Sequence, residues 1–151
     1  MGLTPLRALL KKHTRIALDT SIFIYYLEAN PSYVDVAGEV FAWLERSPHT
    51  AVTSTLTMTE VLVQPYRTGN EPLVNQYFGL LSLFPNLEWI APDLPIADAA
   101  AQIRANHRLR TPDALQAATA IHCGATALLT NDPDLARIPG IEVGVLDQLR
   151  A

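Results

Sequence analysis

The sequence predicts an α/β fold in which a central, mainly parallel sheet of four to five short strands is covered by helices on both faces. Short apolar runs alternate along the chain with longer segments whose apolar residues have helical spacing. No internal repeat, low-complexity stretch or Gly/Ser-rich linker divides the 151 residues. A chain of this length buries about two thirds of its unfolded surface as one compact domain. We therefore expect a single three-layer α/β/α domain.

The composition excludes several classes of protein. With 49% hydrophobic and 17% charged residues, the chain is too apolar to be disordered. No apolar run approaches the roughly 20 residues needed to cross a bilayer, so no membrane partner is expected. The single cysteine, Cys123, has no internal disulfide partner, which fits a reducing compartment and predicts a cytoplasmic location. A net charge of −4 argues against a general nucleic-acid coat protein.

Charge is distributed unevenly between residues 1–15, a basic N-terminal arm, and residues 16–151, the predicted domain. The arm holds Arg7, Lys11, Lys12 and Arg15 and no acid, so the remaining 7 basic and 15 acidic residues give −8. Its leucines precede its lysines, which is not the order of a signal peptide. We expect an amphipathic lead-in or the start of a helix; a short organellar transit peptide is the less favoured alternative.

The first half of the chain predicts three extended segments and four helices. The apolar run Ile16–Leu18 predicts a strand that stops at Asp19, and Thr20 and Ser21 offer hydroxyl caps to a helix over 22–28. The next elements, in order, are a helix around 36–44, a strand over 50–53, a helix over 57–66 that Pro65 kinks or ends, a helix over 71–84 and an extended piece over 87–90.

The second half predicts two more helices and two more strands. Pro95 opens an alanine-rich helix that runs to about residue 107. Thr111, Pro112 and Asp113 are a strong helix start, and Gly124 suits the left-handed end of that helix. Strands are predicted over 126–130 and 141–145, the former followed by Asp132.

Acidic residues occupy the positions where an open parallel sheet binds ligands, at the carboxyl ends of the strands. Asp19 directly follows the first strand, and Asp132 follows the strand over 126–130. Glu60 and Asp113 lie on the first turns of helices that can point to the same edge. We therefore expect four carboxylates from four distant segments to converge there.

Such a cluster needs compensation, because two like charges at 4 Å repel by about 4 kcal/mol at an effective dielectric near 20. Either some carboxyls take up protons or a divalent cation binds between them. Hard oxygen ligands without histidine or cysteine favour Mg²⁺ or Mn²⁺ over zinc. These ions bridge phosphate oxygens and activate water, so the expected reaction is phosphodiester hydrolysis with one or two metals.

Each acid taken alone also has a purely structural explanation. These alternatives are a helix cap by Asp19, a capping box of Thr57 and Glu60, a dipole-favoured position for Asp113, and a turn at Pro133 between Asp132 and Asp134. The order and spacing of all four acids favour a functional set.

Four motifs carry a resemblance to a known family. They are Asp19-Thr20-Ser21, Thr59-Glu60-Val61-Leu62, Thr111-Pro112-Asp113-Ala114-Leu115-Gln116-Ala117-Ala118 and Leu129-Thr130-Asn131-Asp132-Pro133-Asp134-Leu135. In this order they resemble the motifs of PIN-domain nucleases, and VapC-type toxins of toxin–antitoxin pairs in particular. The resemblance extends over nearly the whole chain from Ile16 onward.

The resemblance implies a PIN-like fold and an Mg²⁺- or Mn²⁺-dependent endoribonuclease that acts as the toxin partner of an antitoxin protein. Asp19, Glu60 and Asp113 match the three most regular acids of the family, and Asp132 matches the more variable fourth acid. Thr130 and Ser21 match supporting hydroxyl positions. The resemblance gives no role to Asp134, and the basic arm is longer than is usual in the family.

Two surfaces offer further contacts. The basic stretch Arg104, Arg108 and Arg110 can touch RNA phosphates beside the cut, or simply be a solvated helix end. The segment 22–27 and the helix containing Tyr77 and Phe78 carry more apolar surface than a small sheet covers. Most of it is expected in the core, and the rest in a homodimer contact or a groove for the helix of a partner, which an antitoxin typically occupies in such toxins.

Other functions fit the sequence less well. A phosphorylated receiver domain needs a late lysine, and none follows Lys12. A nucleotide-binding domain needs a glycine-rich phosphate loop, but the seven glycines are scattered. The main alternative is a catalytically inactive PIN-like module that binds RNA or protein. A DNA-directed or 5′ structure-specific nuclease is less favoured, since that group is usually much longer. The presence of all four acids favours the enzyme.

Overall fold

The computed structural model describes residues 2–150 and contains one parallel sheet of five strands in the order β3-β2-β1-β4-β5. The strands are β1 (Arg15–Leu18), β2 (Thr50–Ser54), β3 (Leu87–Ile90), β4 (Ala127–Thr130) and β5 (Glu142–Val145). The helices are α1 (Thr4–Leu10), α2 (Thr20–Leu27), α3 (Val34–Glu45), α4 (Leu56–Arg67), α5 (Glu71–Ser82), α6 (Leu94–Asn106), α7 (Thr111–His122), the 3-10 helix η1 (Pro133–Arg137) and α8 (Leu146–Leu149). This confirms the predicted three-layer α/β/α class.

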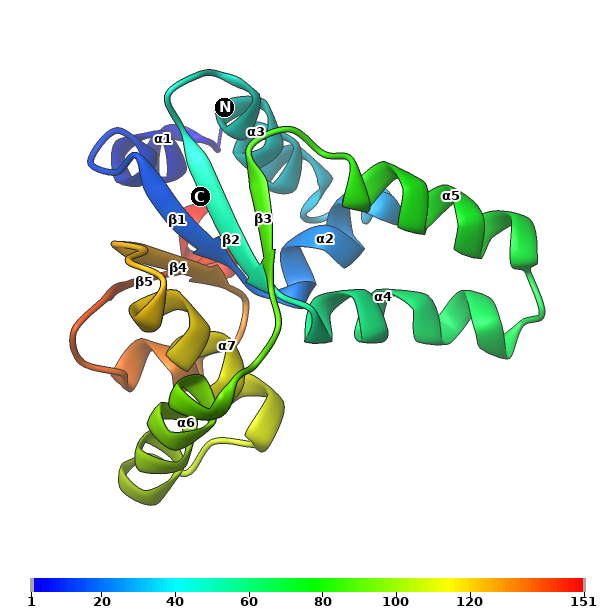
Figure 1. Cartoon of the computed structure of the whole chain (residues 1–151). Coiled ribbons are helices and arrows are strands. Elements are labelled where there is room, and N and C mark those ends of the chain that lie inside the picture. Colours follow the sequence, from blue (N-terminus) through cyan, green and yellow to red (C-terminus); the bar gives the residue numbers. More distant parts are fainter. Residues whose placement is uncertain (1, 151) are drawn as a thin grey trace.

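The central strand β1 has two buried faces, and each contributes to a separate core. Ile16 and Leu18 face the larger core, which α1, α2, α3 and α8 cover. Ala17 faces the smaller core beneath α6 and α7. Figure 1 shows these two helical layers on either side of the sheet. Because all strand pairs are parallel, their carboxyl ends meet along one edge.

Residues 4–10 of the basic arm form helix α1, so the expectation that a helix starts in this arm is confirmed. Leu6, Leu9 and Leu10 are buried in the same core as β1, whereas the basic side chains Arg7 and Lys11 remain exposed. Leucines at this helical spacing place one apolar stripe against the sheet. Residues of the arm therefore contribute to the core of the domain.

Several predicted helix ends are wrong in detail. Helix α2 begins at Thr20, so its cap is Asp19 rather than Thr20 or Ser21. The cap residue of α7 is Arg110, and Thr111 is the first helical residue instead of the cap. Helix α4 passes through Pro65 and ends at Arg67. In each case the first or last turn extends slightly further than local residue preferences indicate.

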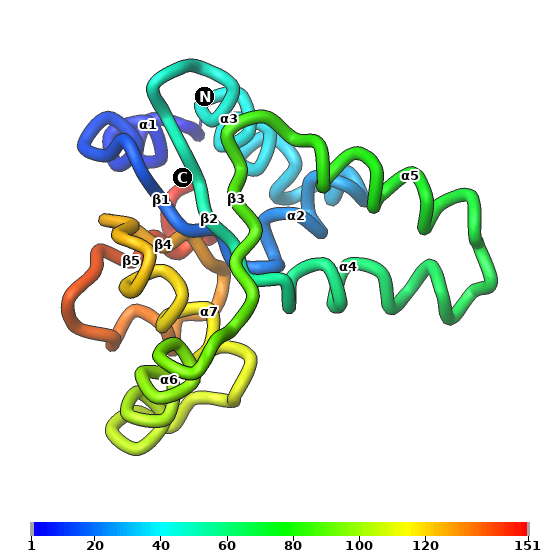
Figure 2. The backbone as a smooth tube through the Cα atoms, viewed as in Figure 1, coloured from blue at the N-terminus to red at the C-terminus, as the bar shows by residue number. Residues whose placement is uncertain are grey.

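The short helices η1 and α8 were not predicted, because a single turn carries too little periodic pattern to stand out in the sequence. Gly124, by contrast, has the expected left-handed backbone, with φ of +77°, directly after α7. Helices α4 and α5 form a hairpin that extends away from the sheet (Figure 2). Within residues 2–150 no helix is both long and apolar enough to span a bilayer.

Gly144 on β5 tests how tightly α1 is packed. A Cβ atom at this buried position would lie 2.8–2.9 Å from side-chain methyl carbons of Leu9, Leu129 and Leu149. We expect Gly144→Ala to lower the free energy of unfolding by about 1–2 kcal/mol, since three leucines must shift together. Urea unfolding monitored by circular dichroism measures this change.

Gly38 in α3 provides the matched control, because a Cβ atom there meets nothing within 4 Å. Gly38→Ala should be neutral or stabilise by about 0.5–1 kcal/mol, as alanine is favoured over glycine inside a helix. Equal effects of the two substitutions would contradict the packing of α1 against β4, β5 and α8.

Candidate active site

The four predicted acids line one pocket at the carboxyl ends of the strands. Asp19 follows β1, Asp132 follows β4, Glu60 comes from α4 and Asp113 from the first turn of α7. We call this the acid pocket; its other lining residues are Thr20, Ser21, Ile24, Tyr25, Arg110, Asn131 and Pro133. The structure thus brings together side chains that are up to 113 positions apart, as the topology of a parallel sheet requires.

Asp19 is held by two donors from different elements. Its Oδ1 accepts the backbone N–H of Thr20 at 2.7 Å, and its Oδ2 accepts the hydroxyl of Thr130 at 2.6 Å. Burial nevertheless raises the pKa of Asp19 from 3.8 to about 6, with smaller upward contributions from Asp113 and Glu60. Asp19 therefore both caps α2 and carries a carboxyl whose charge is unfavourable in this environment.

Glu60 is positioned by a chain of buried hydroxyl groups. Its Oε1 accepts the hydroxyl of Thr20 at 2.6 Å, and the Thr20 hydroxyl also lies 3.3 Å from that of Thr57. Thr57 in turn accepts the side-chain amide of Gln116 at 2.9 Å and lies 2.7 Å from the Thr53 hydroxyl. Among the described residues, Thr57 and Glu60 do not form the alternative capping box, because both side chains are hydrogen-bonded to other residues.

Asp113 is paired with a cation from its own helix end. Its Oδ2 accepts Nε of Arg110 at 3.2 Å, across three residues of sequence. Burial is the largest influence and raises the pKa of Asp113, the Arg110 guanidinium lowers it, and the charges of Asp132 and Glu60 raise it again. Arg110 thus offsets part of the negative charge of the acid pocket.

Asp132 and its neighbours connect β4 to the helices around the pocket. The Asp132 backbone N–H donates to the Thr130 hydroxyl at 3.1 Å, and its Oδ1 accepts the N–H of Asp134 at 2.9 Å. Asn131 donates its amide to the Tyr25 hydroxyl at 2.8 Å. Asp132 therefore caps η1, whereas Asn131 and Tyr25 are pocket residues that sequence reasoning missed.

The hydroxyl groups of Thr130 and Ser21 differ in whether they have hydrogen-bond partners. Thr130 is fully engaged between Asp19 and Asp132. The buried hydroxyl of Ser21 has no hydrogen-bond partner among residues 2–150, although it lines the acid pocket. A buried hydroxyl without a partner is costly, so a ligand in the pocket is a natural partner for it.

The donor set suits a hard divalent cation. The four acids of the pocket offer carboxylate oxygens, and Ser21 adds a free hydroxyl. Among the described residues, no histidine or cysteine lines the pocket. Within residues 2–150 no three acidic, histidine or cysteine side chains already surround one point. Glu60 accepts a hydrogen bond from Thr20 and Asp113 accepts one from Arg110, so part of the acceptor capacity of these two carboxylates is already used.

Only one member of the predicted basic stretch lies in the acid pocket. Arg110 lines it, but Arg104 is directed to the start of α7, where it donates to the carbonyl of Leu109 at 2.9 Å and to the Thr111 hydroxyl at 3.1 Å. Arg108 is exposed on the loop between α6 and α7.

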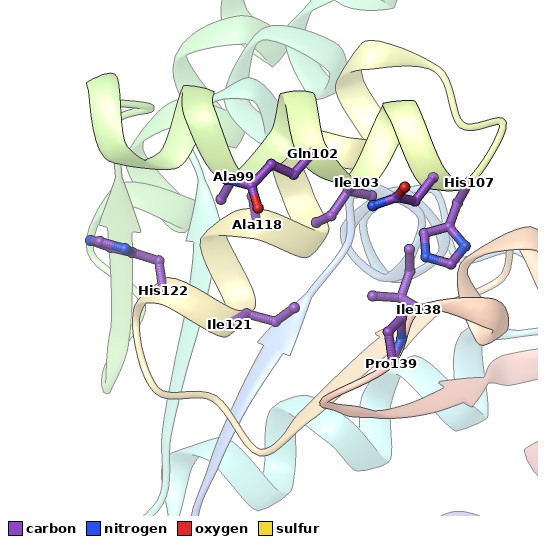
Figure 3. Close-up of a pocket in the computed structure, with 10 residues that line it drawn as sticks. Ala99, Gln102, Ile103, His107, Ala118, Ile121, His122, Ile138 and Pro139 are labelled. Atoms are coloured by element: carbon purple, nitrogen blue, oxygen red, sulfur yellow. The ribbon is translucent and has the colours of Figure 1, made fainter.

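Two of the four histidines line a different cavity, between α6, α7 and the segment that follows η1. Figure 3 shows His107 and His122 at opposite ends of this cavity, with Ile103, Ile121 and Ile138 between them. His13 is bonded to Thr126 and Glu142, and His49 to the carbonyl of Trp43. No histidine of the described chain is therefore placed to act as a base beside the acids.

The profile of the PIN domain family matches residues 16–141, which is most of the chain and includes all four acids. The chain belongs to the PIN domain family. A sequence comparison with curated proteins gives no match.

Solved structures of toxin–antitoxin proteins have the same fold. A toxin–antitoxin complex from Klebsiella pneumoniae is 25% identical, with 87% of this chain and 97% of that chain covered and a TM-score of 0.64. VapBC2 from Rickettsia felis, bound to a promoter DNA fragment, is 22% identical, with 86% and 97% covered and a TM-score of 0.62. VapC20 from Mycobacterium tuberculosis, a toxin that cleaves the sarcin–ricin loop, is 18% identical, with 85% and 98% covered and a TM-score of 0.67.

The raised pKa of Asp19 makes stability depend on pH. The folded state holds the Asp19 proton up to about pH 6, whereas the unfolded chain releases it near 3.8, so stability falls as the pH rises through this window. We expect Asp19→Asn to be more stable than the unmodified PIN domain above pH 6, by up to about 3 kcal/mol at ~1.4 kcal/mol per pKa unit.

Urea unfolding in chelator at pH 4 and at pH 8 checks this expectation. The advantage of Asp19→Asn should be small at pH 4, where the carboxyl is protonated in the folded state and only partly ionised in the unfolded chain. Added Mn²⁺ should stabilise the unmodified domain but not the variant. If Asp19→Asn and the unmodified domain differed in stability by the same amount at both pH values, a raised pKa of Asp19 in the folded state would be ruled out.

Proposed function

We propose that this PIN domain is a metal-dependent endoribonuclease and the toxin of a toxin–antitoxin pair. The observation that carries the proposal is the convergence of Asp19, Glu60, Asp113 and Asp132 on one pocket. Two of the similar structures support the proposal, one by the activity and the other by the complex that its name describes. One is a toxin that cleaves the sarcin–ricin loop, and another is a toxin–antitoxin complex.

The proposed cofactor is Mg²⁺ or Mn²⁺, held by Asp19, Asp113 and Asp132 with Glu60 as a ligand or a group that orients water. When bound, such an ion would activate water and neutralise charge on a phosphate oxygen. Ser21 would donate its free hydroxyl to a ligand in the pocket, and Thr130 would keep Asp19 in place. Thr20 would hold Glu60 through the 2.6 Å hydrogen bond.

Arg108 and Arg110 are proposed to contact RNA phosphates beside the scissile bond, and Arg104 to support them by fixing the start of α7. Arg110 has a side chain that is 78% exposed although it bonds Asp113, so it can reach a phosphate at the mouth of the pocket. Arginine suits this role, because its planar guanidinium pairs well with phosphate oxygens.

The proposed antitoxin site is the apolar groove between α4 and α5. Met58, Leu62, Phe78 and Trp89 line it, and Phe78 is 51% exposed. An amphipathic helix of a partner can cover such a groove with apolar side chains at helical spacing. Tyr66 near the end of α4 and Leu83 after α5 are also exposed, by 62% and 82%, and are proposed as a homodimer contact.

We also propose a cytoplasmic location. Cys123 is a free thiol, as expected in a reducing compartment.

Catalysis by the acid pocket is tested by replacing its carboxylates. Asp19→Asn and Asp113→Asn should each lower the rate of RNA cleavage in Mg²⁺ or Mn²⁺ by about 100-fold or more, because each change removes a charged ligand at the reacting centre. Cleavage of a labelled RNA, followed on denaturing gels, gives the rate, and circular dichroism verifies that the variants are folded.

Asp98→Asn is the matched control, since Asp98 is an exposed acid of α6 that bonds only Gln102 among the described side chains. It should cleave at the unmodified rate. Folded Asp19→Asn and Asp113→Asn proteins that cleave as fast as the control would instead favour an inactive PIN-like binding module.

The groove is tested with a candidate antitoxin encoded next to the gene for this chain. Phe78→Asp should weaken its binding by about 10-fold or more, because a charge would be buried in an apolar contact. Co-purification and calorimetry measure the change. Leu94→Asp is the control, since Leu94 is 85% exposed on α6, outside the groove. Equal binding by the two folded variants would exclude the groove as the docking site.

A further inference from the structure

A second polar pocket lies at the opposite edge of the sheet, where β1 and β2 begin. It has a volume of about 620 Å³, and α1, α3 and the segments preceding β1 and β2 form its walls. We call it the basic pocket; its lining residues are Arg7, Leu10, Lys11, His13, Thr14, Glu39, Trp43, Arg46 and His49. The proposed nuclease function gives it no role.

The cations of the basic pocket exceed its acids. Arg7 is paired with the single acid, Glu39, at 3.2 Å. Lys11 and Arg46 make no side-chain hydrogen bond or ion pair with any of residues 2–150. Two positive charges therefore remain without a partner in a chain whose net charge is −4.

Trp43 provides an independent sign of a missing ligand. Its side chain lines the basic pocket and is only 3% exposed, yet its indole N–H has no acceptor among the described residues. The ring is held firmly, because it stacks on His49 at 4.0 Å and an interplanar angle of 8°. A buried donor of this kind requires an oxygen acceptor, and leaving it without one costs stability.

The positions of Lys11 and Arg46 alone would not indicate a ligand. They are the residues that follow the last turns of α1 and α3, where the helix dipole favours a cation in any case. The dipole does not explain an indole N–H that is buried without an acceptor. The combination of this donor with two unpaired cations is what points to an anion.

We infer that the basic pocket binds the phosphate group of a small phosphate monoester. A monoester carries a charge of about −1.5 to −2 near neutral pH, which matches the two unpaired cations, whereas a diester of an RNA backbone carries a single charge. Because Trp43 lines the pocket, a terminal phosphate that enters it lies beside the indole ring. Helix α1 lies outside the region matched by the family profile, so the basic pocket is partly built by a segment beyond it.

The indole N–H itself is the best reporter of binding. In a ¹H–¹⁵N spectrum of the full chain the two tryptophans give two indole signals, and Trp43→Phe assigns them. Trp89 is an internal reference, because its N–H already donates to the carbonyl of Leu81 at 3.2 Å. Titration with inorganic phosphate and with adenosine 5′-monophosphate should shift the Trp43 signal and leave the Trp89 signal in place.

Charge variants separate a defined site from general attraction. Lys11→Gln combined with Arg46→Gln should weaken phosphate binding at least 10-fold. Lys12→Gln, which removes the neighbouring lysine that pairs with Glu142 at 2.8 Å outside the pocket, should change it less than 2-fold. Equal loss in the two cases would overturn the inference, because binding would then follow net charge alone.

Titration with different ligands distinguishes a nucleotide from inorganic phosphate and from RNA as the source of the bound phosphate. Tighter binding of adenosine 5′-monophosphate than of inorganic phosphate supports a nucleotide, and equal binding supports recognition of the phosphate group alone. A 5′-hydroxyl RNA oligonucleotide that shifts the Trp43 signal when neither small ligand does would overturn the monoester in favour of the RNA backbone. An unmoved Trp43 signal with millimolar amounts of every ligand would overturn the site itself.

Discussion

The burial of carboxylates in one pocket, to which their mutual repulsion adds, is the constraint around which this PIN domain is built. Hydrogen-bond donors placed by neighbouring elements hold the acids in one pocket against that repulsion. The hydroxyl of Thr130 on β4 fixes Asp19 after β1, and the hydroxyl of Thr20 on α2 fixes Glu60 on α4. The raised pKa of Asp19 shows that these bonds do not fully offset burial. A site that remains unfavourable for its own charge is a site that favours a cation.

The positions of the acids were predictable because parallel topology is a strong rule. Once the strands preceding Asp19 and Asp132 are identified from their apolar runs, their carboxyl ends must lie at the same edge. The same rule placed the starts of α4 and α7 beside them. The class of fold and the four acids of the pocket therefore follow from the pattern of the sequence and from its family motifs.

The hydrogen bonds within the pocket were not predictable in the same way. Gln116 and Thr57 are 59 positions apart, and nothing in either segment indicates that they bond to each other. Asn131 and Tyr25 likewise meet only because β4 lies next to β1. The cap of α7 was misplaced by one residue, since Thr111 looks a better cap than Arg110. Asp19 caps α2, a role that the sequence offered only as an alternative to caps by Thr20 and Ser21. Such details depend on tertiary packing rather than on local preference.

The ion pair of Arg110 and Asp113 links the two halves of the proposed reaction. While the acid pocket holds no cation, the guanidinium partly neutralises Asp113 and lowers its pKa. A divalent ion bound to the same carboxylate would take over that neutralisation and weaken the attraction of Arg110 for it. The freed arginine, whose side chain is largely exposed, would then be available to a phosphate at the mouth of the pocket. On the proposed function, cation binding and RNA binding would therefore be coupled through Asp113, and each would favour the other.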